Sequence, residues 1–272
     1  MRLSVDHVTH YRFDPPMRGV IQSLRLTPSV YDGQLAVEWS IETGDAIRGA
    51  AFRDGAGDWI ETAKHPGPVS EAHVAVRGVV ETVDLTGVLR GHRELIPPAA
   101  YLRETRFTRA DIALTELAET AVRRIAPDRG LERAHALMNA VADAIVYSPG
   151  ETEHGTTAAE ALAMGHGVCQ DHTHAVIAAA HVLDMPARYV TGYLFASEDD
   201  ISQEASHAWA EVYIADLGWV GFDPSNRICP DDRYIRVGSG IDATEAAPIR
   251  GVAHGIGAEK LDVSVSVNQA AQ

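Results

Sequence analysis

Hydrophobic and polar residues alternate along much of the first 105 residues, which is the two-residue period of β-strands. The alternation is strict over residues 35–41, and shorter apolar runs occur at residues 3–5, 8–13, 24–26 and 74–80. Segments containing Gly, Pro or Asp separate these runs, at residues 14–16, 31–33, 54–55, 66–68 and 86–87. Because such segments are typical of turns, the pattern predicts an N-terminal antiparallel β-sandwich over residues 1–105.

The period changes after Pro97 and Pro98. Apolar residues then recur every three or four positions over 114–125 and 131–145, which predicts two amphipathic helices. A third helix is predicted over 169–184, before Pro186, and strands follow at 188–190, 206–214 and 219–223. The predicted fold class is therefore α+β, with helices packed on an antiparallel sheet in a second domain over residues 106–272. The alternating tail, residues 261–267, predicts a terminal strand.

Composition and charge exclude two classes of partner. Lys and Arg number 23 against 38 Asp and Glu, so the net charge is −15. Binding to nucleic-acid phosphates needs clustered cations, and we therefore expect no nucleic-acid partner. No apolar stretch reaches the ~18 residues of a membrane-spanning helix, and the first residues lack an apolar signal core. We therefore expect a soluble, cytoplasmic protein with no membrane partner.

The two cysteines, Cys169 and Cys229, are too few for a disulfide scaffold in a chain of 272 residues. Cys169 follows Gly165 and Gly167, which permit a tight turn, and it begins a predicted helix. The unpaired N–H groups and the positive dipole end of a helix N-terminus favour a thiolate over a thiol. Cys169 is therefore either an activated nucleophile or an inert buried cysteine.

A candidate base for this thiol, His207, lies on one of two predicted strands that resemble a hairpin, and Asp223 ends the other. If residues 215–217 form the connection, position 209 lies opposite Asp223, and His207 becomes its diagonal neighbour on the same face. Diagonal neighbours are ~7–8 Å apart at the backbone, a gap that His and Asp side chains can bridge. A connection with an even number of residues puts the two side chains on opposite faces.

Cys169, His207 and Asp223 together have the chemistry of a Cys-His-Asp triad. His207 would take the thiol proton and later deliver it to the leaving group, while Asp223 would orient the imidazole ring and stabilise its cationic form. The sequence therefore predicts nucleophilic catalysis by a thiol.

Four segments together resemble the bacterial transglutaminase-like cysteine peptidase family. They are Gly167 to His174, Pro186 to Tyr193, His207 to Val212 and Gly218 to Pro224. The resemblance covers roughly residues 130–230, and the β-rich residues 1–105 resemble the N-terminal region of many bacterial members. Two segments depart from the family pattern, His172-Thr173 and Gly240-Ile241-Asp242-Ala243.

The resemblance implies a papain-like core in which Cys169, His207 and Asp223 are the catalytic triad. It implies action on amide bonds of a peptide or amide substrate, by hydrolysis or by transfer to an amine, with no organic cofactor. The composition of the family favours hydrolysis. The oligomeric state stays open.

The predicted oxyanion donors are the backbone N–H of Cys169, exposed at a helix start, and one further group. Tyr147, Gln170 and His166 are candidates for this second donor, and Tyr147 is favoured because related cores take an aromatic donor from a segment before the nucleophile helix. Trp209 and His166 are also candidates for the substrate cleft.

Three alternative interpretations accompany the triad. His166, Cys169, His172 and His174 suggest zinc ligands, but residue 174 turns away from the Cys169 face of the helix, and no second Cys/His cluster follows, so we expect no metal site. Cys229 is either incidental or forms a reversible disulfide with Cys169. The core could also be a non-catalytic binding module on a peptidase scaffold.

Overall fold

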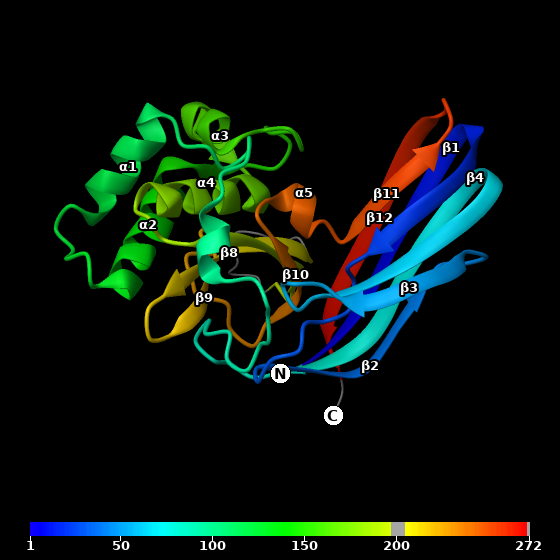
Figure 1. The fold of residues 1–272 in the computed structure, drawn as a ribbon, viewed down its shortest axis with the longest axis horizontal. Helices are drawn as coiled ribbons and strands as arrows, with labels where there is room; N and C mark the ends of the chain where they lie inside the picture. Colours follow the sequence, from blue (N-terminus) through cyan, green and yellow to red (C-terminus); the bar gives the residue numbers. More distant parts are fainter. Residues whose placement is uncertain (197–204, 271–272) are drawn as a thin grey trace.

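The computed structural model describes residues 1–196 and 205–270, and it consists of a long antiparallel sheet beside a part in which helices pack on a smaller sheet (Figure 1). This arrangement confirms the predicted α+β class. The long sheet contains β1 (Arg2–Leu24), β2 (Gln34–Glu42), β3 (Ile47–Arg53), β4 (Trp59–Thr82), β11 (Ile249–His254) and β12 (Ala258–Gln269). The smaller sheet has the order β10-β7-β8-β9, formed by β7 (Ala187–Leu194), β8 (Ser206–Ile214), β9 (Gly218–Phe222) and β10 (Tyr234–Gly240).

The helices lie between residues 98 and 182, except for one short helix near residue 245. They are η1 (Pro98–Leu102), α1 (Ile112–Val122), α2 (Gly130–Ala144), α3 (Ala158–Met164), α4 (Cys169–Val182) and α5 (Ala243–Ala246). Two short parallel strands, β5 (Val146–Tyr147) and β6 (His166–Gly167), precede α4. Among the described residues, no helix is both long and apolar enough to cross a membrane.

The predicted N-terminal strands form one continuous sheet around the long pair β1 and β4. Along β4, β2 pairs with residues 75–82 and β3 with residues 59–64. Along β1, β12 pairs with residues 3–14 and β11 with residues 19–24. The strand predicted at residues 261–267 is therefore present, and it joins the sheet that residues 2–82 begin rather than the smaller sheet.

Two predicted turns lie inside strands instead of between them. Residues 14–16 belong to β1, and residues 66–68 belong to β4. The pairing of β1 with β4 is interrupted between Arg12 and Met17, where Pro15 and Pro16 have no N–H to donate. The prolines therefore produce an irregularity in two long strands and do not reverse the chain.

Helix α4 is the central element of the helical part. It contacts α1, α2, α3 and β8, so its residues from Asp171 to Ala180 are all buried. Small apolar residues make this close packing possible, because Ala208 and Ala210 of β8 belong to the same core cluster as Ala178 and Ala179 of α4. This packing fixes the N-terminus of α4 against β8, where the candidate site lies.

A buried ion network joins the smaller sheet to the beginning of β4. The Glu211 carboxylate in β8 accepts hydrogen bonds from Arg188 Nε at 2.7 Å and from Arg236 Nε at 2.8 Å. Arg236 also donates to Asp58, which immediately precedes β4, at 3.1 Å. None of these four side chains is more than 3% exposed. Because each buried charge has an opposite partner, the network connects the two sheets without leaving an isolated charge.

Candidate active site

The turn before α4 is fixed by hydrogen bonds to one carboxylate. The backbone N–H of Val168 donates to Asp171 Oδ2 at 2.9 Å, and the hydroxyl of Thr152 donates to the same oxygen at 2.6 Å. A Cβ atom on Gly167 would lie 2.7 Å from Cβ of Asp171, which leaves room for glycine only. The sequence Gly-Val-Cys-Gln-Asp therefore holds Cys169 at the first position of the helix.

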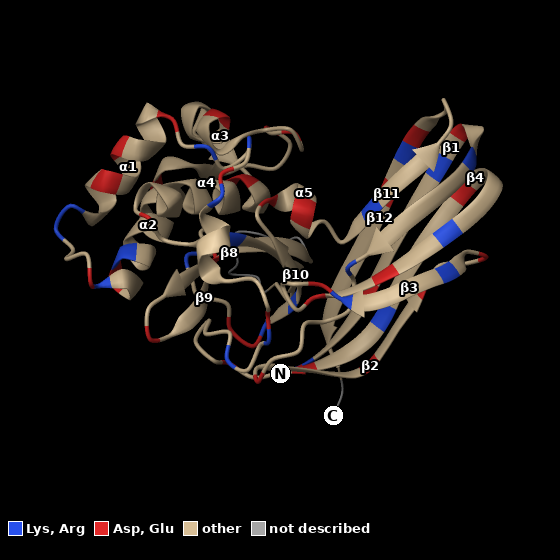
Figure 2. Ribbon diagram, in the orientation of Figure 1, with Lys and Arg blue, Asp and Glu red and all other residues tan. Residues whose placement is uncertain are grey.

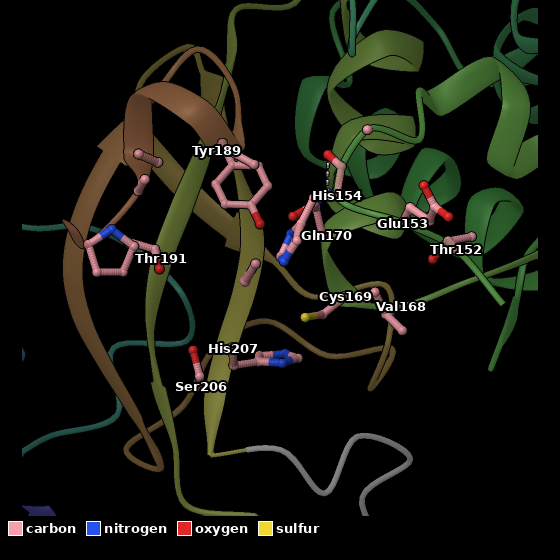
Figure 3. Close-up of a pocket in the computed structure, with 16 residues that line it drawn as sticks. Thr152, Glu153, His154, Val168, Cys169, Gln170, Tyr189, Thr191, Ser206 and His207 are labelled. Carbon is pink, nitrogen blue, oxygen red and sulfur yellow. Dashed lines mark hydrogen bonds between the residues drawn. The ribbon is translucent and has the colours of Figure 1, made fainter. Parts of the chain in front are cut away.

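The Cys169 thiol lies beside the His207 ring at one wall of a pocket (Figure 3). Cys169 is 8% exposed and His207 is 2% exposed, so both side chains are largely shielded from bulk water. His207 belongs to β8, which packs against α4. Nδ1 of His207 is buried and makes no hydrogen bond with a described residue, so it is the ring nitrogen left for the thiol.

His207 and Asp223 are joined by a hydrogen bond of 2.7 Å between Nε2 and Oδ2. The register of the hairpin produces this contact, because Ala210 pairs with Phe222 and residues 215–217 form the connection. The predicted odd connection is therefore confirmed, and the two side chains share one face of the hairpin. Asp223 also accepts hydrogen bonds from Tyr234 Oη at 2.7 Å and Asn226 Nδ2 at 2.9 Å.

The electrostatic environment favours a charged imidazole. Burial disfavours the cationic ring, but the Asp223 carboxylate, its hydrogen bond and the neighbouring Cys169 thiol outweigh burial and raise the pKa of His207 to about 10. Burial likewise disfavours the Asp223 carboxylate, yet His207, Tyr234 and Asn226 keep its pKa below the ordinary value. The arrangement can therefore hold a proton on His207 that comes from the thiol.

The pocket beside Cys169 has a volume of about 760 Å³. Its walls come from the loop at residues 152–155, the start of α4 at 168–170, residues 189 and 191 of β7, the start of β8 at 206–208, and residues of the segment 243–248. None of the described residues that line it is Lys or Arg, and Glu153 is the one carboxylate among them. Acidic positions also recur nearby on α3 and α5 (Figure 2).

The sequence-predicted oxyanion residues lie at different distances from this pocket. Gln170 lines it, and its amide Nε2 donates to the carbonyl of His154 at 3.4 Å. Tyr147 lies in β5, with its ring 6.1 Å from that of His172, and is not among the residues that line the pocket. Of the three side-chain candidates, Gln170 is therefore the one that lines the pocket beside the thiol.

The two predicted cleft residues lie outside the pocket. Trp209 is 2% exposed and packs edge-on against Tyr234, with ring centroids 5.5 Å apart. His166 is exposed in β6 and hydrogen-bonds with Ser148 at 3.1 Å. Trp209 therefore packs behind the His207 and Asp223 pair, whereas His166 lies on the surface beside the entry to α4.

Two of the three histidines in the alternative zinc set are buried and bind protein groups. His172 uses both ring nitrogens, toward the Ser225 hydroxyl at 3.0 Å and the Ile145 carbonyl at 2.8 Å. Nε2 of His174 accepts from the backbone N–H of Ala243 at 3.1 Å, and burial lowers the pKa of His174 to about 4. The described residues contain no group of three or more potential metal ligands.

Cys229 is a free, half-buried thiol, and Cys169 is free as well. Cys229 packs beside Gly87 and is not among the residues that line the pocket. Burial, with a smaller effect from Asp84, raises its pKa to about 11. At neutral pH Cys229 therefore carries its proton, a state in which thiols react slowly.

Sequence reasoning missed three residues of the site: Tyr189, Asn226 and Tyr234. A signal for Asn226 was present, because in Asp223-Pro-Ser-Asn the carboxylate can accept from backbone groups two and three residues later. It accepts from Ser225 N at 2.9 Å and Asn226 N at 3.3 Å. Tyr234 reaches Asp223 only through the pairing of β10 with β7, which no local pattern indicates.

A cysteine at the start of a buried helix, beside a histidine on an antiparallel sheet, defines a cysteine-dependent class of enzyme core. Residues 115–224 match the transglutaminase-like superfamily, and residues 3–81 match the bacterial transglutaminase-like N-terminal region. Residues 115–224 therefore form a transglutaminase-like core, and residues 3–81 form the bacterial transglutaminase-like N-terminal region, as the resemblance in the sequence indicated.

Similar proteins include an uncharacterized protein of Mycobacterium leprae, 28% identical over 288 residues and covering 99% of both chains. An uncharacterized protein of Mycobacterium tuberculosis is 36% identical over 131 residues, which are 44% of this chain and 42% of that protein. The crystal structure of a candidate cysteine protease from Cytophaga hutchinsonii has a TM-score of 0.76 at 20% identity, covering 100% of this chain and 91% of that one. At this identity, the likeness shows a shared fold.

Proposed function

We propose that the protein is a cysteine-dependent amide hydrolase that acts on a peptide or amide substrate through Cys169, His207 and Asp223. The observation that carries this proposal is the position of the Cys169 thiol beside the buried His207 ring. Nε2 of this ring is hydrogen-bonded to Asp223 Oδ2 at 2.7 Å. A nucleophile, a base and a group that orients the base are the parts that acyl transfer through a thioester requires.

In the proposed reaction, Nδ1 of His207 takes the thiol proton, and the thiolate attacks the carbonyl carbon of the amide. The carbonyl oxygen becomes negatively charged and accepts a hydrogen bond from the backbone N–H of Cys169 at the start of α4. The C–N bond then breaks, His207 delivers its proton to the leaving amine, and the acyl group remains on sulfur as a thioester.

Hydrolysis completes the cycle. His207 takes a proton from water, and the resulting hydroxide attacks the thioester carbonyl. The C–S bond then breaks to release a carboxylic acid, and His207 returns its proton to the Cys169 sulfur. Asp223 keeps Nε2 of His207 as a donor throughout and stabilises the imidazolium that forms twice in each cycle. If an amine reaches the thioester instead of water, the same residues transfer the acyl group.

The test is incubation of a peptide and amide library with wild-type protein and with Cys169→Ala, with and without a primary amine, followed by mass spectrometry. We expect hydrolysis products that carry one added water in wild type and none with Cys169→Ala. Amine adducts in place of acids would assign a transferase instead. Equal turnover by the two proteins, or rapid substrate binding with no thiol reactivity toward iodoacetamide, would contradict the proposal and favour a binding module.

A further inference from the structure

The side chain of Tyr189 is a buried polar group in the pocket that the triad mechanism does not use. Tyr189 lies on β7 opposite Ala210, is 5% exposed and lines the same pocket as Cys169 (Figure 3). Its hydroxyl makes no hydrogen bond with any residue that the structure describes. The Tyr189 oxygen is not among the fully buried, unpartnered polar atoms of the described residues, so it opens to the pocket and can donate to a ligand there.

The ring of Tyr189 is held in place by its neighbours. Its centroid is 5.2 Å from that of His174 in α4, and the His174 ring stacks at 5.1 Å on Phe107. Nε2 of His174 accepts a hydrogen bond from the backbone N–H of Ala243, at the start of α5. Tyr189 is thus fixed between α4 and the pocket wall that residues 243–248 form, and its hydroxyl is preorganised for a ligand.

The wall next to Tyr189 has small, uncharged side chains. Thr191 follows two residues later on β7, and Ala243, Ala246 and Pro248 line the same pocket. This side of the pocket therefore suits an uncharged group of modest size.

The hydroxyl itself stays neutral and can donate a hydrogen bond. Burial raises the pKa of Tyr189 well above its ordinary value, and the nearby Cys169, Asp171 and Asp242 raise it further. The same three groups that oppose a phenolate also oppose a carboxylate at this position, since both carry negative charge. A neutral acceptor, such as an amide oxygen, carries no net charge and is not repelled by these groups.

We propose that Tyr189 is a specificity-determining residue that donates its hydroxyl hydrogen bond to an uncharged acceptor, a carbonyl or carboxamide oxygen, on the substrate group next to the reacting amide. This inference rests on the proposed amide hydrolase function and adds a substrate class to it. An apolar group of the same shape forms no hydrogen bond with the hydroxyl, and a carboxylate adds a further negative charge near Asp171 and Asp242.

The experiment compares Leu, Asn and Asp at the residue next to the cleaved amide, because these side chains are similar in size and differ in polarity and charge. The three peptides are prepared twice, with the variable residue before and after the cleaved bond. For wild type we expect kcat/KM for Asn to exceed that for Leu and for Asp on one of the two sides. The variant Tyr189→Phe should lose roughly 10-fold to 100-fold on the Asn peptide and change little on the Leu peptide.

Tyr213→Phe is the matched control, since it removes a tyrosine hydroxyl from the far end of β8, where the side chain is 36% exposed. It should keep the wild-type preference. An equal loss by Tyr189→Phe on all three peptides, or no loss on any, would overturn the specificity role. If wild type cleaves none of the peptides and no other amide, the proposed hydrolase function fails instead, so the two failures can be told apart.

Discussion

His207 and Asp223 share a hydrogen bond of 2.7 Å between Nε2 and Oδ2, and both side chains are almost completely buried. Their contact depends on a three-residue connection between β8 and β9, because one residue more or fewer would move one of them to the other face of the sheet. The proton-transfer chemistry that we propose for the site therefore depends on the length of a surface turn.

Replacement of Asp223 by Asn tests the charge in this contact. The asparagine keeps a similar shape but no longer raises the pKa of His207, so burial dominates and the imidazole loses its proton at lower pH. The ion pair of imidazolium and thiolate should then be rare near pH 6. We expect iodoacetamide to modify Cys169 at least about 10-fold more slowly at that pH, and amide turnover to fall about 100-fold or more.

The control for this change is Asp262→Asn, which removes an exposed carboxylate of β12 paired with Arg12. Its alkylation rate should equal that of wild type. A rate for Asp223→Asn that matches the control at pH 6 would contradict the role given to Asp223.

Replacement of Glu211 by Gln tests the buried ion network. The variant leaves the guanidinium groups of Arg188 and Arg236 buried without their shared carboxylate. We expect the free energy of unfolding to fall by about 3–5 kcal/mol, measured by chemical denaturation at pH 7. Glu132→Gln, which affects an exposed pair with Arg129, should change it by less than about 0.5 kcal/mol. If Glu211→Gln lowers the free energy of unfolding as little as this control does, the ion network contributes little to stability.

The buried His174 predicts a dependence of stability on acid. Because burial lowers its pKa from 6.5 to about 4, the unfolded chain binds a proton more readily than the folded protein. The contribution of His174 to stability is complete above pH 6.5, decreases as the pH falls, and is lost below pH 4. It amounts to about 3 kcal/mol. His174→Gln, which can still accept from Ala243 N, should show a smaller decrease in melting temperature between pH 7 and pH 4.5.

Burial also lowers the pKa of His7 to about 4. The His174→Gln variant should therefore keep the part of the acid sensitivity that comes from His7. Melting curves of the two proteins that remain parallel over the whole pH range would contradict the assignment to His174.

Replacement of Gly167 by Ala tests the turn into α4. The added Cβ lies 2.7 Å from Cβ of Asp171, so Asp171 must move and its hydrogen bond to Val168 N weakens. We expect a loss of about 1–3 kcal/mol in unfolding free energy, with slower alkylation of Cys169. Gly155→Ala is the control for stability, since a Cβ there meets no atom within 4 Å. Equal stability of the two variants would show that the turn tolerates the side chain.

The sequence predicted those parts of the site that local periodicity controls. Glycines before an apolar helix indicated the position of Cys169, and the two-residue period with an odd connection predicted that His207 and Asp223 share a face. Trp209 lies on that face too, as the period requires, but its side chain packs against Tyr234 of β10, and only His207 borders the pocket. Which face borders a cavity depends on the order of strands in the sheet, and local sequence contains little information about that order.

The same limit applies to the N-terminal region. Pro15 and Pro16 indicated a turn because proline has no N–H for pairing, yet β1 continues through them with an interruption of its ladder. The two strands that complete the outer edge of β1 come from residues 249–269, more than 200 positions later in the chain. Pairing at such separation is decided by tertiary packing.

That pairing has a consequence for how the protein is made. During synthesis on the ribosome, β1 and β4 are available early, but the outer edge of β1 remains without its partners until residues 249–269 have left the exit tunnel. A strand edge exposed for so long attracts other chains. We therefore expect the first sheet to be completed late in synthesis, and a nascent chain arrested before residue 249 to bind chaperones.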